Sequence, residues 1–503
     1  MVTRISGLAS GMDIDTLVKN LVKADSQPLT KLNQQKQLLE WKRDNYRETS
    51  VKLVSFIQDK LSSLSKSASL NAQKATTTGN TTAVTAKATS SASGVMEITV
   101  DKLATAAKSI SSSAPTLSDS SATASNWGEV KLSDIAGSGI SGSEVIKVKI
   151  GSAEIEIDPA TETLGTFVGK INSSKNAGVT AFIDNTTGKV SLTSKTTGGA
   201  DIALTGNIFS ALNLGTSLTG GSDAKLNVNG IDITNASNSL TVNGVEITLN
   251  SPTNGTATRI EVNKDVDSIV ATVQSFVDSY NELLSFMNGK TNEERYSKYT
   301  PLSSEEKSAM TDDEIELWTS KAKSGMLKND SILTSAISDM RAAMVQGVTL
   351  SDGSKISFAD LGMSTGTYET KGKLLLDTDK LKASLEKNPD IVNTFFGQNY
   401  STSTVNNSYT ENDGIFARMR KISNTAVIKL AETAGTSKYS SDLTAAFLSN
   451  STMGTQLLGM DRRISELTSK ISMKETNYYK KFTAMETAIN KYNNISSSIA
   501  SYL

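Results

Sequence analysis

The apolar residues at both ends of the chain recur at steps of three, four and seven positions, which is the spacing of coiled-coil helices. Near the N-terminus, Asp13 or Asp15 can cap a first helix, Pro28 interrupts it, and a longer helix follows. Val18 and Val22 accompany the stripe of the first helix. The stripe that runs along these helices consists of Leu17, Leu21, Leu32, Leu39, Tyr46, Leu53, Ile57, Leu61 and Leu64.

The C-terminal end has a matching pattern. Neither glycine nor proline occurs after Gly459, and Lys474 interrupts the apolar stripe. The stripe is made of Ile464, Leu467, Ile471, Tyr478, Phe482, Met485, Ile489 and Tyr492. A long helix with one narrow apolar stripe is unstable alone and needs a partner helix. We therefore expect the two ends to form one coiled-coil stalk, which also mediates self-association. The alternative is two unrelated surface helices on a globular body.

Between about residues 72 and 262 the pattern changes to short alternating runs that favour β-strands. Serine, threonine, glycine and asparagine dominate this region. The run from Leu226 to Thr234 recurs from Leu240 to Thr248, and each copy places Asn-Gly between alternating apolar residues. Asn-Gly in that setting is a strong hairpin signal, so the repeat predicts two hairpins and an antiparallel sheet.

Helical periodicity returns from Asp265, and the pairs Ser303–Glu306 and Thr311–Glu314 have the spacing of capping boxes. The helices near residues 291–325 have no role that the sequence reveals. Overall the sequence predicts a multidomain α+β protein with a terminal coiled coil, a helix-rich inner domain and inserted β-rich outer domains. The predicted domains are residues 1–45 with 455–503, residues 46–72 with 263–454, residues 73–110 with 220–262, and residues 111–219.

The composition removes most enzyme classes. The chain has no histidine and no cysteine, so it lacks imidazole bases, thiol nucleophiles and the usual zinc ligands. A carboxylate-based glycosidase using Asp13 or Glu314 is the enzyme alternative that remains. We expect no catalytic site, no cofactor and no metal.

The charge and hydropathy patterns bear on partners and location. Lysine plus arginine number 51 and aspartate plus glutamate 52, a balance that argues against binding to nucleic acid. No apolar run approaches the roughly 20 residues of a membrane span, so we expect no membrane insertion. The first residues lack the apolar core of a secretory signal, and sequence rules alone would place the chain in the cytosol.

Several motifs resemble those of a known family, the flagellar filament cap proteins, also called hook-associated protein 2. The N-terminal run Ile5-Ser-Gly-Leu-Ala-Ser-Gly-Met-Asp-Ile-Asp15 is similar to the family's opening motif. Later runs that resemble family blocks are Asp223-Ala-Lys-Leu-Asn-Val-Asn-Gly230, Gly372-Lys-Leu-Leu-Leu-Asp377 and Phe395-Phe-Gly397, followed by the helix from Met460. The residues that carry the opening motif are Gly7, Leu8, Ser10, Gly11 and Asp13.

This resemblance implies a function that the spacing alone does not show. Such proteins are exported through the flagellar channel without a cleaved signal, so the expected location is extracellular, at the tip of a bacterial flagellar filament. They form a homo-oligomeric cap, often a pentamer, beneath which flagellin inserts and polymerises. The partners implied are flagellin, hook-associated junction proteins and a flagellar export chaperone. Two alternatives stay open: an adhesin that binds host mucin or glycans through the β-rich domains, and another axial protein such as a hook–filament junction protein.

Overall fold

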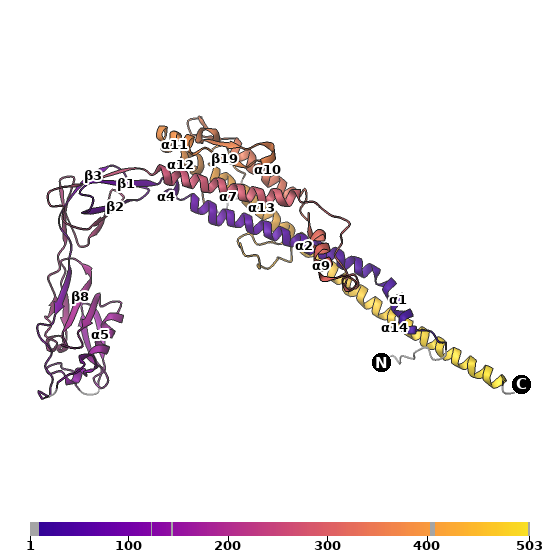
Figure 1. Cartoon of the computed structure of the whole chain (residues 1–503), viewed down its shortest axis with the longest axis horizontal. Coiled ribbons are helices and arrows are strands. Elements are labelled where there is room, and N and C mark those ends of the chain that lie inside the picture. Colours follow the sequence, from indigo (N-terminus) through magenta and orange to yellow (C-terminus); the bar gives the residue numbers. More distant parts are fainter. Residues whose placement is uncertain (1–9, 122, 142–143, 403–407, 501–503) are drawn as a thin grey trace. The chain divides into compact units, whose positions relative to one another are not determined.

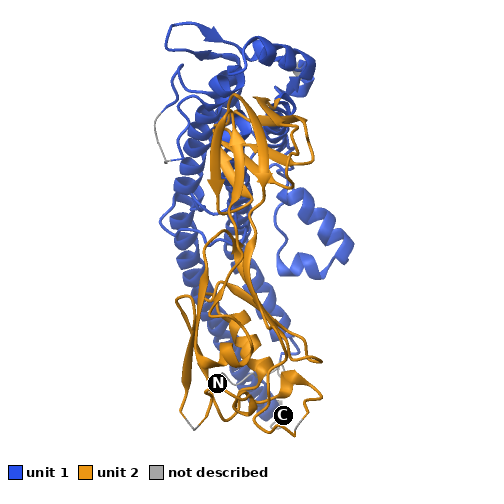
Figure 2. Ribbon diagram, turned by 90° about the vertical axis from the view of Figure 1, so that its left-hand side faces the viewer, with its two compact units in different colours: residues 1–70, 266–503 blue, residues 71–265 orange. Residues whose placement is uncertain are grey.

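The computed structural model describes residues 10–121, 123–141, 144–402 and 408–500. The chain divides into two compact units, one of residues 1–70 with 266–503 and one of residues 71–265 (Figure 2). The first unit is mainly helical and the second mainly β-sheet (Figure 1). The predicted fold class, a multidomain α+β protein with helical ends and a β-rich middle, is confirmed.

Unit 1 is built from helices of very different lengths. The N-terminal part contains α1 (Ile14–Asp25), α2 (Gln27–Ser55), a π-helical segment (Phe56–Leu61), α3 (Ser62–Leu64) and α4 (Ser67–Leu70). After unit 2 come α7 (Val266–Asn292), α8 (Ser304–Ser308), α9 (Asp312–Lys323), α10 (Ser331–Val345), α11 (Thr378–Lys387), α12 (Ile391–Gly397), α13 (Ile415–Ala434) and α14 (Thr452–Ala500). Two short hairpins pair β16 (Val348–Thr349) with β17 (Lys355–Ile356) and β18 (Met363–Thr365) with β19 (Leu374–Leu376).

Local signals in the sequence explain where several of these helices begin. Both predicted capping boxes are present, at Ser303 before α8 and at Thr311 before α9. Asp330 accepts hydrogen bonds from the first turn of α10. The start of α14 differs from the prediction: the helix begins at Thr452 and runs through Gly454 and Gly459. A Cβ on Gly454 would lie 2.4 Å from the carbonyl oxygen of Ser449, so this glycine permits close packing rather than ending a helix.

The body of unit 1 has an aromatic core. Phe276 of α7, Phe396 of α12 and Phe416 of α13 pack with ring centroids 5.1–5.4 Å apart, and Phe395 adjoins Phe396 at 5.1 Å. All four rings are fully buried. Tilted and edge-on pairs of this kind add to the free energy gained from burial. The C-terminal half of α2 packs against α13 and shares this body.

A buried arginine fastens the loops beside that core. The guanidinium of Arg418 donates to the backbone carbonyls of Asp413, Ala343, Gly347 and Glu411, at 2.6–2.9 Å. Its side chain is fully buried. Burial lowers the pKa of Arg418, and the four carbonyl oxygens compensate for much of the solvation that the cation loses.

Unit 2 contains four sheets in two groups. One group has the five-stranded sheet β1-β15-β3-β11-β12 and the three-stranded sheet β13-β14-β2; the other has β10-β9-β5-β6 and β4-β8-β7. The strands are β1 (Gln73–Gly79), β2 (Val84–Ala88), β3 (Val95–Lys102), β4 (Ala106–Ile110), β5 (Ile146–Ile150), β6 (Ala153–Ile157), β7 (Val179–Ile183), β8 (Val190–Thr197), β9 (Ile202–Thr205), β10 (Ser217–Leu218), β11 (Ala224–Val228), β12 (Ile231–Asn235), β13 (Ser239–Val242), β14 (Val245–Leu249) and β15 (Thr258–Lys264). Its helices are α5 (Leu164–Ser173), α6 (Asn207–Ala211) and the 3-10 turns Trp127–Glu129 and Leu132–Asp134.

Each copy of the sequence repeat forms its hairpin as predicted. Asn229-Gly230 joins β11 to β12 and Asn243-Gly244 joins β13 to β14, with positive φ at all four turn residues. The expectation of a single sheet is wrong, because β11 pairs with β3 whereas β14 pairs with β2. The two hairpins therefore belong to different sheets.

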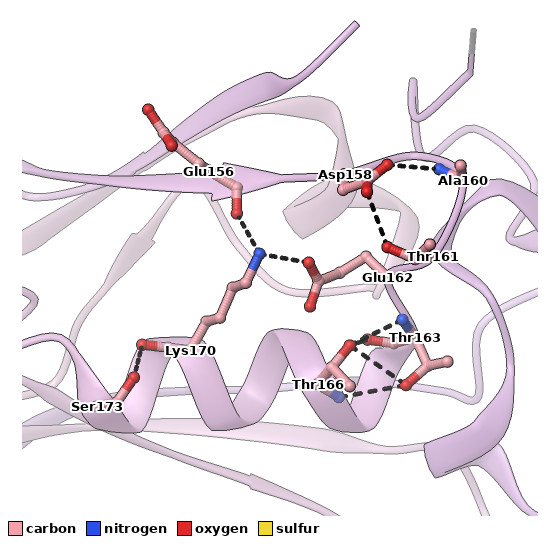
Figure 3. Close-up of polar contacts among 9 residues, drawn as sticks. All are labelled: Glu156, Asp158, Ala160, Thr161, Glu162, Thr163, Thr166, Lys170 and Ser173. Atoms are coloured by element: carbon pink, nitrogen blue, oxygen red, sulfur yellow. Dashed lines mark hydrogen bonds and ion pairs between the residues drawn. The ribbon is translucent and has the colours of Figure 1, made fainter. Parts of the chain in front are cut away.

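The second group of sheets is braced by α5. A capping box between Thr163 and Thr166 starts this helix, one residue before Leu164 (Figure 3). Lys170 then reaches from α5 to the backbone carbonyl of Glu156, at 2.9 Å, and to the buried carboxylate of Glu162 (Figure 3). These contacts tie the helix to β6 and to the segment that follows it.

Unit 2 has two separate hydrophobic cores. One draws its buried residues from positions 83–104 and 224–260, and the other from positions 107–218. The boundary between units 1 and 2 lies at 70/71 and 265/266, close to the predicted 72/73 and 262/263. The further division of each unit into two domains remains a prediction.

Candidate functional site: a stalk built from both termini

The helices at the two ends of the chain lie side by side in unit 1. We call residues 10–45 and 455–500 the terminal stalk: it comprises α1, the first half of α2, and α14 (Figure 1). Both α1 and α2 contact α14. The two helical ends therefore pack together in one stalk and are not two unrelated surface helices.

The N-terminal side of the stalk bends at Ser26. Asp13 caps α1 by accepting a hydrogen bond from the backbone N–H of Thr16 at 3.0 Å. The helix ends at Asp25, and Pro28 stands in the first turn of α2, where its missing N–H costs nothing. The expected interruption is therefore an elbow one residue long.

Polar contacts set an antiparallel register between the two sides. From the inner part of the stalk outward, Lys36 of α2 pairs with Asp461 at 2.6 Å, Asp25 of α1 with Lys474 at 2.6 Å, and Asp15 accepts from the hydroxyl of Tyr479 at 3.0 Å. Farthest out, the hydroxyl of Ser10 donates to the carboxylate of Glu486. As the N-terminal partner moves back toward residue 10, the C-terminal partner advances toward residue 486. The register is therefore continuous along the stalk.

The interruption of the C-terminal stripe by Lys474 has a structural reason. Its amine meets the carboxylate of Asp25 at the C-terminal end of α1, and the hydroxyl of Tyr478 donates to the same carboxylate at 2.9 Å. These hydrogen bonds, from Lys474 first and Tyr478 second, lower the pKa of Asp25. The same bonds raise the pKa of Lys474 and of Tyr478. Lys474 therefore helps to fix the register between α1 and α14, although it interrupts the apolar stripe.

The residues of the two predicted stripes are placed at three levels of burial. The inner ones, Tyr46, Leu53, Ile57 and Leu61, are fully buried and belong to the body of unit 1. The ones along the stalk are half-buried: Leu32, Leu39, Ile464, Leu467, Ile471, Tyr478, Phe482, Met485 and Ile489, as is Leu64 beyond the π-helical segment. These stalk residues are only half-buried because the stalk has two helical sides, and one flank of the stripe stays exposed to solvent.

Three predicted seam residues face solvent instead. Leu17 and Leu21 are each 39 % exposed, because Ile14 and Val18 on the neighbouring edge of α1 are the buried residues. Tyr492 is 71 % exposed and lies beyond Glu486, the outermost α14 residue with a described N-terminal partner in this register. Among the described residues of the stalk, these three lie outside the buried seam.

The opening motif lies at the outer end of the stalk. Ser10 binds Glu486, whose side chain is fully buried in α14, and Asp13 caps α1. Gly11 has a φ of +69°, which a residue with a side chain rarely adopts. Gly7 and Leu8 lie outside the described residues.

Sequence reasoning gave no role for the helical insert near residues 291–325. It contacts the helices on both sides of the elbow: Glu305 of α8 pairs with Lys23 of α1 at 2.9 Å, and the carbonyl of Pro301, just before α8, accepts from the side chain of Gln34 of α2 at 2.8 Å. Pro301 is buried. The paired Ser303 and Thr311 capping signals indicated the helices but not where they dock.

The two carboxylates considered as catalytic candidates, Asp13 and Glu314, both cap helices. Asp13 caps α1, and Glu314 closes the capping box of α9, where hydrogen bonds from Thr311 lower the pKa of the carboxyl. Among the described residues, no three acidic side chains gather as metal ligands would. No helix in the described part of the chain combines the length and apolarity needed to cross a bilayer.

Comparisons with known proteins agree with this arrangement. The profile of the flagellar hook-associated protein 2 C-terminus matches residues 221–494, and that of its N-terminus matches residues 10–107. The flagellar hook-associated protein 2 of Halalkalibacterium halodurans is 27 % identical over 97 % of this chain and 98 % of its own length. That of Thermotoga maritima is 32 % identical over 50 % of this chain and 41 % of its own length.

A solved structure shares the fold. The D1-D2-D3 domains of the flagellar cap protein FliD from Escherichia coli superpose with a TM-score of 0.53 at 21 % identity, covering 83 % of this chain and 99 % of that one. The family profiles together reach from the opening motif to the outer part of α14. The chain belongs to the flagellar hook-associated protein 2 family.

Proposed function

We propose that this protein is a structural cap at the growing tip of a bacterial flagellar filament, where it self-assembles and promotes flagellin insertion and polymerisation. The observation that carries the proposal is a family relationship spanning 97 % of the chain, in a molecule whose termini share one stalk. Membership of the family fits a scaffold and not an enzyme. The site of action is extracellular, at the filament tip.

Self-assembly is supported by the outer part of the stalk. Tyr492, Ile495 and Ile499 of α14 are 71 %, 46 % and 57 % exposed, and Leu17 and Leu21 add apolar surface on α1. Exposed apolar residues repeated along one helix favour packing against further helices. We propose a homo-oligomer of five copies in which the predicted seam residues contact neighbouring copies.

The other partners follow from the same role. A cap at the tip meets flagellin as substrate of assembly, hook-associated junction proteins before the filament forms, and an export chaperone on the way out. The adhesin alternative has no support in the relatives reported above, which carry flagellar names. The two profile matches likewise favour hook-associated protein 2 over another axial protein.

The function can be tested in a strain that lacks the gene. We expect flagellin to appear in the medium as monomer, and filaments to return when the purified protein is added. A variant with Tyr492→Asp and Ile495→Asp should fail to restore filaments, whereas Lys491→Asp on the same exposed turn should succeed. Normal filaments in the deletion strain would remove the proposed function.

A further inference from the structure

The loop between α13 and α14 is held to α2 by its backbone. Side chains on one side of α2 and of the following π-helical segment donate hydrogen bonds to carbonyl oxygens of this loop and of Ala434, the last residue of α13. The five bonds are Arg43 to Ala434 at 2.7 Å and to Leu448 at 3.2 Å, Arg47 to Leu443 at 3.0 Å, Ser50 to Ser437 at 3.1 Å and Gln58 to Tyr439 at 3.0 Å. We call residues 436–450 the clamped loop. These bonds hold the backbone of the loop and do not involve Tyr439, Leu443 or Leu448 through their side chains.

One aromatic side chain of the clamped loop faces inward and the rest of its large apolar side chains face out. Phe447 lies against the guanidiniums of Arg43 and Arg47, 4.0 Å and 3.7 Å from its ring centroid. Tyr439, Leu443 and Leu448, in contrast, are 69 %, 55 % and 53 % exposed. A loop fixed firmly with three large apolar side chains in water is the arrangement of an interaction surface.

A recess with both polar and apolar lining lies beside the clamped loop, which contributes Lys438 and Tyr439 to it. Its volume is about 210 Å³; the apolar part of its lining consists of Val54, Ile57, Val427, Ile428 and the ring of Tyr439, and Gln58 and Asn424 add polar groups. It is located where α2 gives way to the π-helical segment, a local geometry that often accompanies functional sites. The charged residues that line it are Arg420 and Lys438, with no carboxylate among the lining residues.

The chemistry of the recess matches the exposed part of the clamped loop. At the turn of the loop, Asp442 places an acid directly beside the exposed Leu443. Apolar side chains beside two cations suit an apolar side chain flanked by a carboxylate. This chain itself carries such a pair of groups, Asp442 and Leu443, in a fixed conformation.

We propose that the recess of one copy receives Asp442 and Leu443 of a second copy. The contact joins two different surfaces, so it passes from copy to copy and closes into a ring when the rotation between copies permits. This inference rests on the proposed function, because it names one interface of the self-assembling cap. It assigns to unit 1 a contact additional to those of the terminal stalk.

The test uses the full-length protein and measures self-association by analytical ultracentrifugation. Leu443→Ser should weaken association at least about tenfold, the equivalent of roughly 1.4 kcal/mol. The matched control is Leu317→Ser on α9, because Leu317 is 63 % exposed in the same unit and should leave association unchanged. Hydrogen exchange of each diluted variant verifies that α13 and α14 stay folded.

Charge reversal adds a readout that a loss of folding could not give. Asp442→Lys and Lys438→Glu should each weaken association, and the double variant should restore it, because the reversed charges meet again across the interface. Unchanged association in Leu443→Ser, or no rescue in the double variant, would overturn this contact while leaving a stalk-mediated assembly in place. A wild-type protein that stays monomeric at all concentrations would remove both this contact and the proposed function.

Discussion

The body and the terminal stalk of unit 1 are both helical, yet they are stabilised differently. The body closes around four phenylalanine rings and a buried arginine that donates four hydrogen bonds to backbone carbonyls. The stalk has half-buried apolar residues and takes its register from surface pairs such as Asp25 with Lys474. The body is therefore complete within one chain, whereas the stalk keeps a flank on which other helices can pack.

The largest effect should come from opening the aromatic core. Phe396→Ala removes a ring that contacts Phe276, Phe395 and Phe416, and we expect the free energy of unfolding to fall by about 3–5 kcal/mol. Urea unfolding followed by helical circular dichroism measures this. Phe182→Ala is the control, because that ring is 65 % exposed and its loss should change stability by less than about 0.5 kcal/mol. Equal effects of the two variants would contradict the difference in packing.

A smaller loss should follow from removing the buried cation. Arg418→Met leaves carbonyls of the neighbouring loops without donors, and each unsatisfied buried group costs about 1–3 kcal/mol. We expect a loss of at least about 2 kcal/mol in the same unfolding experiment. Arg462→Met, on the exposed face of α14, should have little effect. A stability equal to that of the wild type would show that water replaces the guanidinium at no cost.

In the stalk the expected effect is local. Tyr478→Phe deletes the hydroxyl that donates to Asp25, so the amides of α1 should exchange several-fold faster while those of α13 do not change. Tyr492→Phe should leave both helices unaffected, because Tyr492 is largely exposed. Slower or uniform exchange throughout unit 1 in the Tyr478 variant would argue against a separate, weaker stalk.

The smallest effect should be a pH dependence of the same contact. The folded pKa of Asp25 is lowered, so the folded state binds fewer protons than the unfolded state at mildly acidic pH. The stabilisation is fully present above the ordinary carboxyl pKa and is lost as the pH falls through the lower, folded value. Intrinsic-rate-corrected exchange of α1 amides should therefore accelerate below about pH 4. Asp25→Asn should remove this dependence; if it persists in that variant, another carboxylate is responsible.

Much of this architecture could be predicted from the sequence, because its signals are local. The heptad stripes, the capping boxes and the Asn-Gly turns each specify an element within a few residues. Such local signals did not specify which distant segments of the chain pair with one another. The second repeat hairpin pairs with β2 and the first with β3, and neither choice is encoded in the repeat itself.

The stalk shows the same limit at single residues. Periodicity placed Leu17 and Leu21 on the seam, but Ile14 and Val18 are the residues of α1 that are buried. Gly459 looked like a helix boundary, yet α14 continues through it. The insert that touches both sides of the elbow gives only capping signals, because docking of Pro301 on Gln34 depends on a contact 267 positions apart in the chain.

The pairing of the two termini can be measured directly by the distance between two spin labels. The chain has no cysteine, so labels can be placed at Lys19→Cys and Thr476→Cys without removing native thiols. In dilute protein we predict a short, narrow distance distribution. Moving the second label to Lys491→Cys, 15 positions along α14, should lengthen the distance by up to about 22 Å at 1.5 Å per residue. Broad distributions that do not distinguish the two sites would contradict a shared antiparallel stalk.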